Sequence, residues 1–128
     1  MPQKSAKKPL ILVVEDERIL AKALKIKLTE ADFAVNLAYD GEEAISALNK
    51  KKPDLILLDI LLPKMTGIEF LREARKRKVW KNIPVIVISN YTAEGPMAEV
   101  FDLGVVEYLI KSDTPINKIV EKIKKITK

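Results

Sequence analysis

The sequence contains neither cysteine nor histidine. Without cysteine there is no disulfide, no thiolate metal site and no cysteine nucleophile. Without histidine the chain lacks the usual base at neutral pH, the commonest zinc ligand, a Ser-His-Asp triad and any phosphohistidine of its own. Any chemistry must therefore use carboxylates, hydroxyls and lysines.

Long apolar runs are missing as well. No stretch approaches 18 uncharged apolar residues, so the sequence predicts no transmembrane helix. Residues 1–9 are basic, but the apolar run after them is too short for a signal peptide, and no cleavage pattern is present. We therefore expect a soluble, cytoplasmic protein without a membrane partner. It should have a basic flexible tail over residues 1–9 and a single domain over residues 10–128.

Positive charge outweighs negative charge, with 23 basic and 18 acidic residues and a net charge of +5. The tail supplies +3 and residues 115–128 supply +4, which leaves −2 on residues 10–114. A basic total can indicate nucleic acid or an acidic partner. A lysine-rich solubilising surface explains the same charge, and we favour that interpretation.

Five short apolar runs alternate with five segments of helical periodicity. The runs are continuous, which is typical of strands buried on both faces of a parallel sheet. We expect strands at residues 10–14, 34–39, 54–58, 84–88 and 105–110, and helices at 18–29, 41–50, 66–78, 92–103 and 116–127. Five βα units in this order predict an α/β fold, a (βα)5 doubly wound five-stranded parallel sheet.

Polar residues follow four of the predicted strands. Glu15 and Asp16 follow the first, Asp59 the third, Ser89 ends the fourth, and Lys111 follows the fifth. Ligands of open α/β sheets bind beyond these carboxyl ends. Neighbouring acids repel unless a cation neutralises them, and Mg²⁺ suits oxygen ligands completed by water and phosphate. A lone acid would be an ordinary helix cap or loop residue, but the whole set indicates a site for a phosphoryl group on a carboxylate.

Residues 10–125 resemble the receiver domain of two-component response regulators, and are similar to single-domain chemotaxis receivers. The resemblance rests on the acidic pair at 15–16, the run from Leu57 to Gly67, Ser89, and Tyr108 with Lys111. Each motif alone is weak, whereas the ordered set is specific. The resemblance implies a flavodoxin-like fold with strand order 2-1-3-4-5.

The resemblance also implies a role for each residue of the site. Asp59 matches the aspartate that a partner histidine kinase or phosphotransfer protein phosphorylates. Asp16 matches the direct Mg²⁺ ligand, Glu15 the acid that holds the ion through water, and Asp59 and the backbone carbonyl of Leu61 two further ligands. Lys111 matches the lysine that pairs with the phosphoryl group.

Two more residues match the switch of the family. Ser89 matches the hydroxyl that moves to bond a phosphoryl oxygen, and Tyr108 matches the aromatic side chain that follows this movement. The domain would then present a changed face to an output protein, for which the basic last helix is a candidate contact. Such a domain is not an enzyme beyond self-phosphotransfer and slow self-dephosphorylation.

The chain departs from the family pattern near the site. Asn90 stands where a small residue is usual, and Ser112 stands where the family has a proline in a cis bond. We therefore predict a trans bond between Lys111 and Ser112, because a non-proline cis bond costs about 2.5–4 kcal/mol. Leu61 and Tyr91 are neither good acids nor good bases, so we also predict a long-lived phosphoryl group.

Three other functions fit parts of the sequence. An aspartate-nucleophile phosphatase needs a second aspartate two residues after the first, where this chain has Leu61. A nucleotide or flavin binder of the same fold would carry a glycine-rich phosphate loop, which the four glycines do not form. A nucleic-acid binder could use the lysines of the last helix, but no helix-turn-helix follows it. We expect a stand-alone receiver, and the sequence leaves its kinase, output partner and oligomeric state open.

Overall fold

The computed structural model describes residues 8–91 and 94–127. Five parallel strands form one sheet in the order β2-β1-β3-β4-β5, as the resemblance implied. The strands are β1 (Leu10–Val14), β2 (Ala34–Ala38), β3 (Leu55–Leu58), β4 (Val85–Ser89) and β5 (Val105–Ile110). The helices are α1 (Arg18–Glu30), α2 (Gly41–Lys50), α3 (Gly67–Arg75), α4 (Glu94–Asp102) and α5 (Ile116–Thr127).

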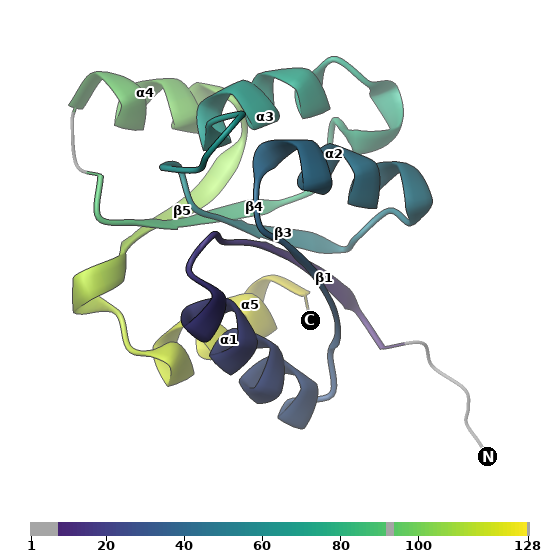
Figure 1. The fold of residues 1–128 in the computed structure, drawn as a ribbon, viewed down its shortest axis with the longest axis vertical. Coiled ribbons are helices and arrows are strands. Elements are labelled where there is room, and N and C mark those ends of the chain that lie inside the picture. The colour runs from purple at the N-terminus through teal and green to yellow at the C-terminus, as the bar shows by residue number, and fades with distance from the viewer. Residues whose placement is uncertain (1–7, 92–93, 128) are drawn as a thin grey trace.

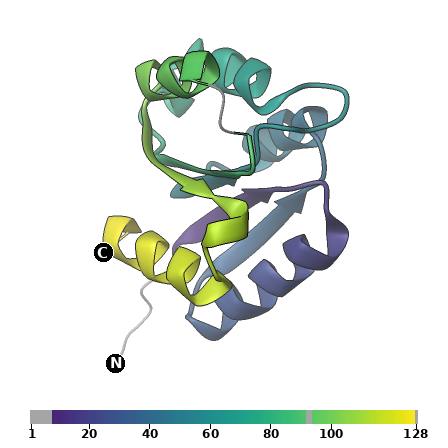
Figure 2. The same ribbon diagram turned by 90° about the vertical axis from the view of Figure 1, so that its left-hand side faces the viewer.

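The helices cover both faces of the sheet. Figure 1 shows α1 and α5 on one face and α2, α3 and α4 on the other, and Figure 2 shows α1 and α5 side by side beneath the sheet. Every residue of β1, β3 and β4 is buried. Alternate residues of these strands enter two apolar clusters, one on each face. This double burial explains why the three strands read as continuous apolar runs.

Both ends of α3 differ from those predicted. Thr66 caps α3 with a reciprocal pair of hydrogen bonds to Glu69, so the helix begins one residue later than expected. It ends at Arg75, and a separate 3-10 turn, η1 (Lys78–Trp80), follows because Arg77 is extended and Trp80 is buried. Of the helix predicted over residues 92–103, the structure shows α4 over Glu94–Asp102, and residues 92–93 lie outside the described residues.

The strand register brings the predicted site together. Val14 of β1 lies opposite Leu58 of β3, and the N–H of Asp59 donates to the Val14 carbonyl at 3.0 Å. On the other side, Ser89 of β4 lies opposite Ile110 of β5, directly before Lys111. The residues after these strands therefore meet at one edge of the sheet.

Two predictions remain, a basic tail over residues 1–9 and the lack of a transmembrane helix. Residues 1–7 of the predicted tail lie outside the described residues. Among residues 8–91 and 94–127, no helix has the length and apolar character needed to cross a membrane.

Candidate functional site

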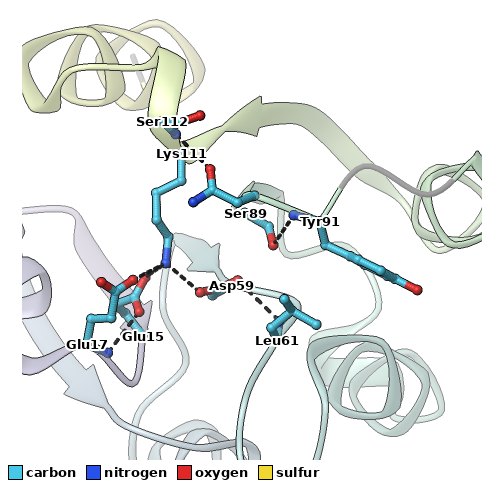
Figure 3. Close-up of polar contacts among 9 residues, drawn as sticks. Glu15, Glu17, Asp59, Leu61, Ser89, Tyr91, Lys111 and Ser112 are labelled. Atoms are coloured by element: carbon cyan, nitrogen blue, oxygen red, sulfur yellow. Dashed lines mark hydrogen bonds and ion pairs between the residues drawn. The ribbon is translucent and has the colours of Figure 1, made fainter.

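Asp59 lies at the centre of the site, directly after β3, and is 3% exposed. Its Oδ1 accepts a hydrogen bond from the backbone N–H of Leu61 at 3.2 Å, and its Oδ2 lies 2.7 Å from the Nζ of Lys111 (Figure 3). Gly67 makes this turn possible, because a Cβ there would lie 2.5 Å from the Asp59 carbonyl oxygen. The carboxylate is thus fixed on one side and faces a cation on the other.

Lys111 reaches three carboxylates from the first turn after β5, the 3-10 turn η2 (Lys111–Asp113). Its Nζ lies 2.7 Å from Asp59 Oδ2, 2.6 Å from Glu17 Oε2 and 2.9 Å from Glu15 Oε1. Burial alone would lower the pKa of Lys111, but its ion pairs with Asp59, Glu17 and Glu15 outweigh this and raise the pKa above its usual value. The lysine therefore remains a cation at physiological pH.

Glu15 is fully buried after β1, which is unusual for a carboxylate. Its Oε2 accepts the N–H of Glu17 at 2.9 Å. Its Oε1 lies near Lys111 Nζ but out of line for a hydrogen bond, and no other polar group of the described residues bonds it. Burial raises the pKa of Glu15 to about 7, with Lys111 and the Glu17 N–H acting in the opposite direction. A second cation would stabilise the charged form of this group.

Carboxylate oxygens of Glu15, Glu17 and Asp59 lie within 4.8 Å of one another. A set made only of oxygen donors, with one buried oxygen lacking a hydrogen bond, fits a hard divalent ion such as Mg²⁺. Asp16, which the resemblance assigned as the direct ligand, is exposed and does not belong to this group. Its role as a ligand, and that of the Leu61 carbonyl, stay predictions.

Glu17 is the member of the cluster that the sequence reasoning missed. It is the third acid in the Glu-Asp-Glu run after β1, and it is the N-terminal capping residue of α1. The run of three acids after β1 is the sequence signal that makes Glu17 a candidate for the site. Their order along the chain does not say which of the two exposed side chains turns back toward Lys111.

Ser89 and Tyr108 are linked through the loop after β4. The buried Ser89 Oγ accepts the N–H of Tyr91 at 3.1 Å, and the hydroxyl of Tyr108 donates to the Tyr91 carbonyl. The half-buried Tyr108 ring packs against the apolar cluster and lies 6.5 Å from the Phe101 ring. Burial raises the pKa of Tyr108, so its hydroxyl remains a donor at neutral pH. Both predicted switch residues therefore contact the same loop residue.

Leu61 and Tyr91, on which the predicted long lifetime of the phosphoryl group rests, lie differently relative to Asp59. Leu61 is 55% exposed beside Asp59, whereas the Tyr91 side chain points away from Asp59 (Figure 3). Tyr91 packs against the apolar cluster instead. It therefore does not cover Asp59 in this structure. The peptide bond between Lys111 and Ser112 is trans, as predicted.

The family model of the response regulator receiver domain matches residues 11–124. The chain belongs to this family. This receiver domain is 35% identical over 105 residues to the alkaline phosphatase synthesis transcriptional regulatory protein PhoP of Bacillus subtilis (strain 168). The match covers 82% of this chain and 43% of that protein, so the chain spans less than half the length of this relative.

Solved receiver domains share the fold of this one. The CheY-like receiver domain protein of Methanospirillum hungatei JF-1 superposes with a TM-score of 0.87 at 25% identity, over 94% of each chain. The receiver domain of the Francisella response regulator 1452 gives a TM-score of 0.84 at 28% identity, over 94% of this chain and 97% of the other. The predicted flavodoxin-like fold and receiver-domain function are confirmed.

Proposed function

We propose that this receiver domain accepts a phosphoryl group on Asp59 in a Mg²⁺-dependent reaction. The supporting observation is the contact of 2.7 Å between the buried Asp59 carboxylate and Lys111, beside two further acids at the carboxyl edge of the sheet. We assign the role of phosphodonor to the phosphohistidine of a partner kinase or phosphotransfer protein. This chain itself has no histidine that could carry the group.

The reaction is a direct transfer between two nucleophiles. A carboxylate oxygen of Asp59 forms a bond to phosphorus while the bond from phosphorus to the donor nitrogen breaks, and the nitrogen keeps the electron pair. Lys111 leaves part of its carboxylate cluster to pair with the phosphoryl oxygens. Ser89 exchanges its contact with the Tyr91 N–H for a bond to one of those oxygens, and Tyr108 follows the loop.

Mg²⁺ would be held by the acidic groups of the site, Glu15 and Asp59 with Asp16 or Glu17. When bound, it supplies positive charge that balances the phosphoryl oxygens during transfer. The protein residues do the rest: Asp59 attacks, Lys111 and Ser89 position the phosphoryl group, and Tyr91 and Tyr108 carry the change outward. The domain is then a switch with only self-phosphotransfer and slow self-dephosphorylation as chemistry.

The donor protein must reach Asp59 at this edge of the sheet. An apolar groove lies there between the first turns of α1 and α5, lined by Glu17, Ile19, Leu20 and Ile116 among others. Ile19 is 88% exposed. Because Glu17 belongs to both the groove and the site, we propose this face for the donor, and the basic helix α5 as a candidate contact for the output protein.

Phosphorylation by a small donor tests the proposal directly. With acetyl phosphate or phosphoramidate and Mg²⁺, intact mass should show one added phosphoryl group on the wild-type protein. Asp59→Asn should show none, and chelation of Mg²⁺ should abolish the gain. Asp113→Asn, an exposed change on the neighbouring turn, serves as the matched control and should be phosphorylated. Equal labelling of Asp59→Asn would contradict the assignment.

A further inference from the structure

Asn90 and Ser112, the two residues that depart from the family pattern, are bonded to each other. The backbone N–H of Ser112 donates to Asn90 Oδ1 at 2.8 Å, across 22 positions of the chain. Asn90 directly follows Ser89 at the end of β4, and Ser112 directly follows Lys111 at the end of β5. The bond therefore joins the two loops that carry Ser89 and Lys111.

The bond depends on both departures. A proline at position 112 has no N–H to donate, and a small side chain at position 90 has no oxygen that reaches it. The first N–H groups of η2 have no partner within the turn, and its capping residue Ile110 gives no side-chain bond. The Asn90 oxygen accepts a hydrogen bond from one of these groups, the Ser112 N–H. Asn90 thus provides the acceptor and Ser112 the donor.

Both chain neighbours of Lys111 are fixed by contacts with the end of β4 and the loop that follows it. Ile110 pairs with Ser89 in the sheet just before it, and Ser112 is bonded to Asn90 just after it. The remaining bonds of the turn are local: Thr114 Oγ1 donates to the Ile110 carbonyl at 2.7 Å, and the Thr114 N–H reaches the Lys111 carbonyl at a long 3.4 Å. Only the Asn90 bond ties the described residues of η2 to the loop after β4 through a side chain.

We propose that Asn90 is a positioning residue that holds Lys111 against Asp59 through the Ser112 N–H. This inference rests on the proposed phosphorylation of Asp59. It goes further in assigning Asn90 a role, because Asn90 keeps Ser89 and Lys111 at a fixed separation on either side of the phosphoryl group.

A double-mutant cycle on the full chain tests the inference. The variants are Asn90→Ala, Ser112→Pro and the pair together, with Asn82→Ala as the matched control, since Asn82 is exposed at the opposite end of β4. The rate of phosphorylation by phosphoramidate with Mg²⁺ should fall by about three- to tenfold in Asn90→Ala and stay within about twofold in Asn82→Ala. In the Ser112→Pro background, Asn90→Ala should cause no further loss of rate, because the proline has already removed the N–H that bonds Asn90.

Two further measurements separate positioning from folding. Thermal melting of each variant should show a folded protein at the assay temperature, so that the coupling lies in the rate. In the wild type, NMR should show a scalar coupling across the hydrogen bond from the Ser112 nitrogen to the Asn90 side-chain carbonyl carbon. Independent, multiplicative losses in the cycle, or no such coupling, would overturn the inference. An unreactive wild type would instead refute the proposed function.

Discussion

At the scale of single residues, Leu61 should set the lifetime of the phosphoryl group. Its exposed side chain beside Asp59 offers no hydrogen bond to a water that attacks phosphorus. A polar side chain there could orient this water, so Leu61→Asn should hydrolyse faster. We expect about a tenfold gain, less than the 10²–10⁴ of a full acid–base group.

Decay of the phosphorylated protein, followed by intact mass, measures this rate. Tyr91→Phe is the control and should decay like the wild type, because the Tyr91 side chain points away from Asp59 (Figure 3). Faster decay in Tyr91→Phe than in Leu61→Asn would show that the tyrosine, and not the leucine, protects the phosphoryl group.

Substitutions of Asp16 and of Glu17 should affect the affinity for Mg²⁺ differently. Glu17 is already paired with Lys111, and its side chain is 61% exposed. The family match makes Asp16 the direct ligand. We therefore expect Asp16→Ala to weaken Mg²⁺ by about tenfold or more, and Glu17→Ala by much less, in a calorimetric titration. A larger loss in Glu17→Ala would assign the ion to the cluster of Glu15, Glu17 and Asp59.

The sequence predicted most of the site because strand ends of one sheet must meet at one edge. Asp59, Glu15 and Lys111 each directly follow a predicted strand, so their convergence needed only the strand order. Glu17 could not be placed in the same way. It caps α1 in an extended conformation, and side-chain direction in such a turn depends on contacts with Lys111 that no local pattern contains.

At the scale of elements, Arg75 joins three segments on the face covered by α3 and α4. Its guanidinium donates to the carbonyls of Leu103, Trp80 and Ile83 at 2.7, 2.9 and 2.9 Å. Arg75→Met should lower the free energy of unfolding by about 2–4 kcal/mol, because it leaves partly buried carbonyls without their charged donor.

Arg72→Met is the matched control for Arg75→Met, one turn earlier on α3. Arg72 pairs with Glu99 while about half exposed, and such pairs contribute about 0–1 kcal/mol. Urea unfolding of both variants compares the two losses. Equal losses would show that the three carbonyl bonds add nothing beyond a surface ion pair.

The same region shows where sequence patterns fail for the fold. The central strands were predictable, since double burial leaves continuous apolar runs. The end of α3 was not, because residues 76–78 continue a helical pattern while Trp80 packs into the core and the chain turns to reach β4. The Arg75 carbonyl contacts were also not predictable, since they join residues up to 28 positions apart.

At the scale of the whole molecule, one carboxylate of the site, that of Glu15, is buried in the interior of the receiver domain. Glu15 is fully buried directly after the interior strand β1, where an apolar residue would pack without charge. Lys111 compensates only in part, because one Glu15 oxygen has no hydrogen bond. The stability of the entire fold should therefore depend on the protonation of this one group and on the ions present.

Replacement of Glu15 by glutamine measures this dependence. The pKa of Glu15 is about 7 in the folded protein and 4.5 ordinarily, so the folded state binds the proton more tightly. The resulting stabilisation is present at low pH and is lost as pH rises from about 4.5 to 7. Relative to wild type, Glu15→Gln should thus gain up to about 3 kcal/mol in unfolding free energy between pH 4.5 and 8 without Mg²⁺.

Urea unfolding at both pH values, in a chelator, tests this difference. Saturating Mg²⁺ at pH 8 should then stabilise the wild type more than the variant, because the ion binds the charged carboxylate. A difference between the two proteins that is the same at both pH values would show that Glu15 ionises normally in the fold.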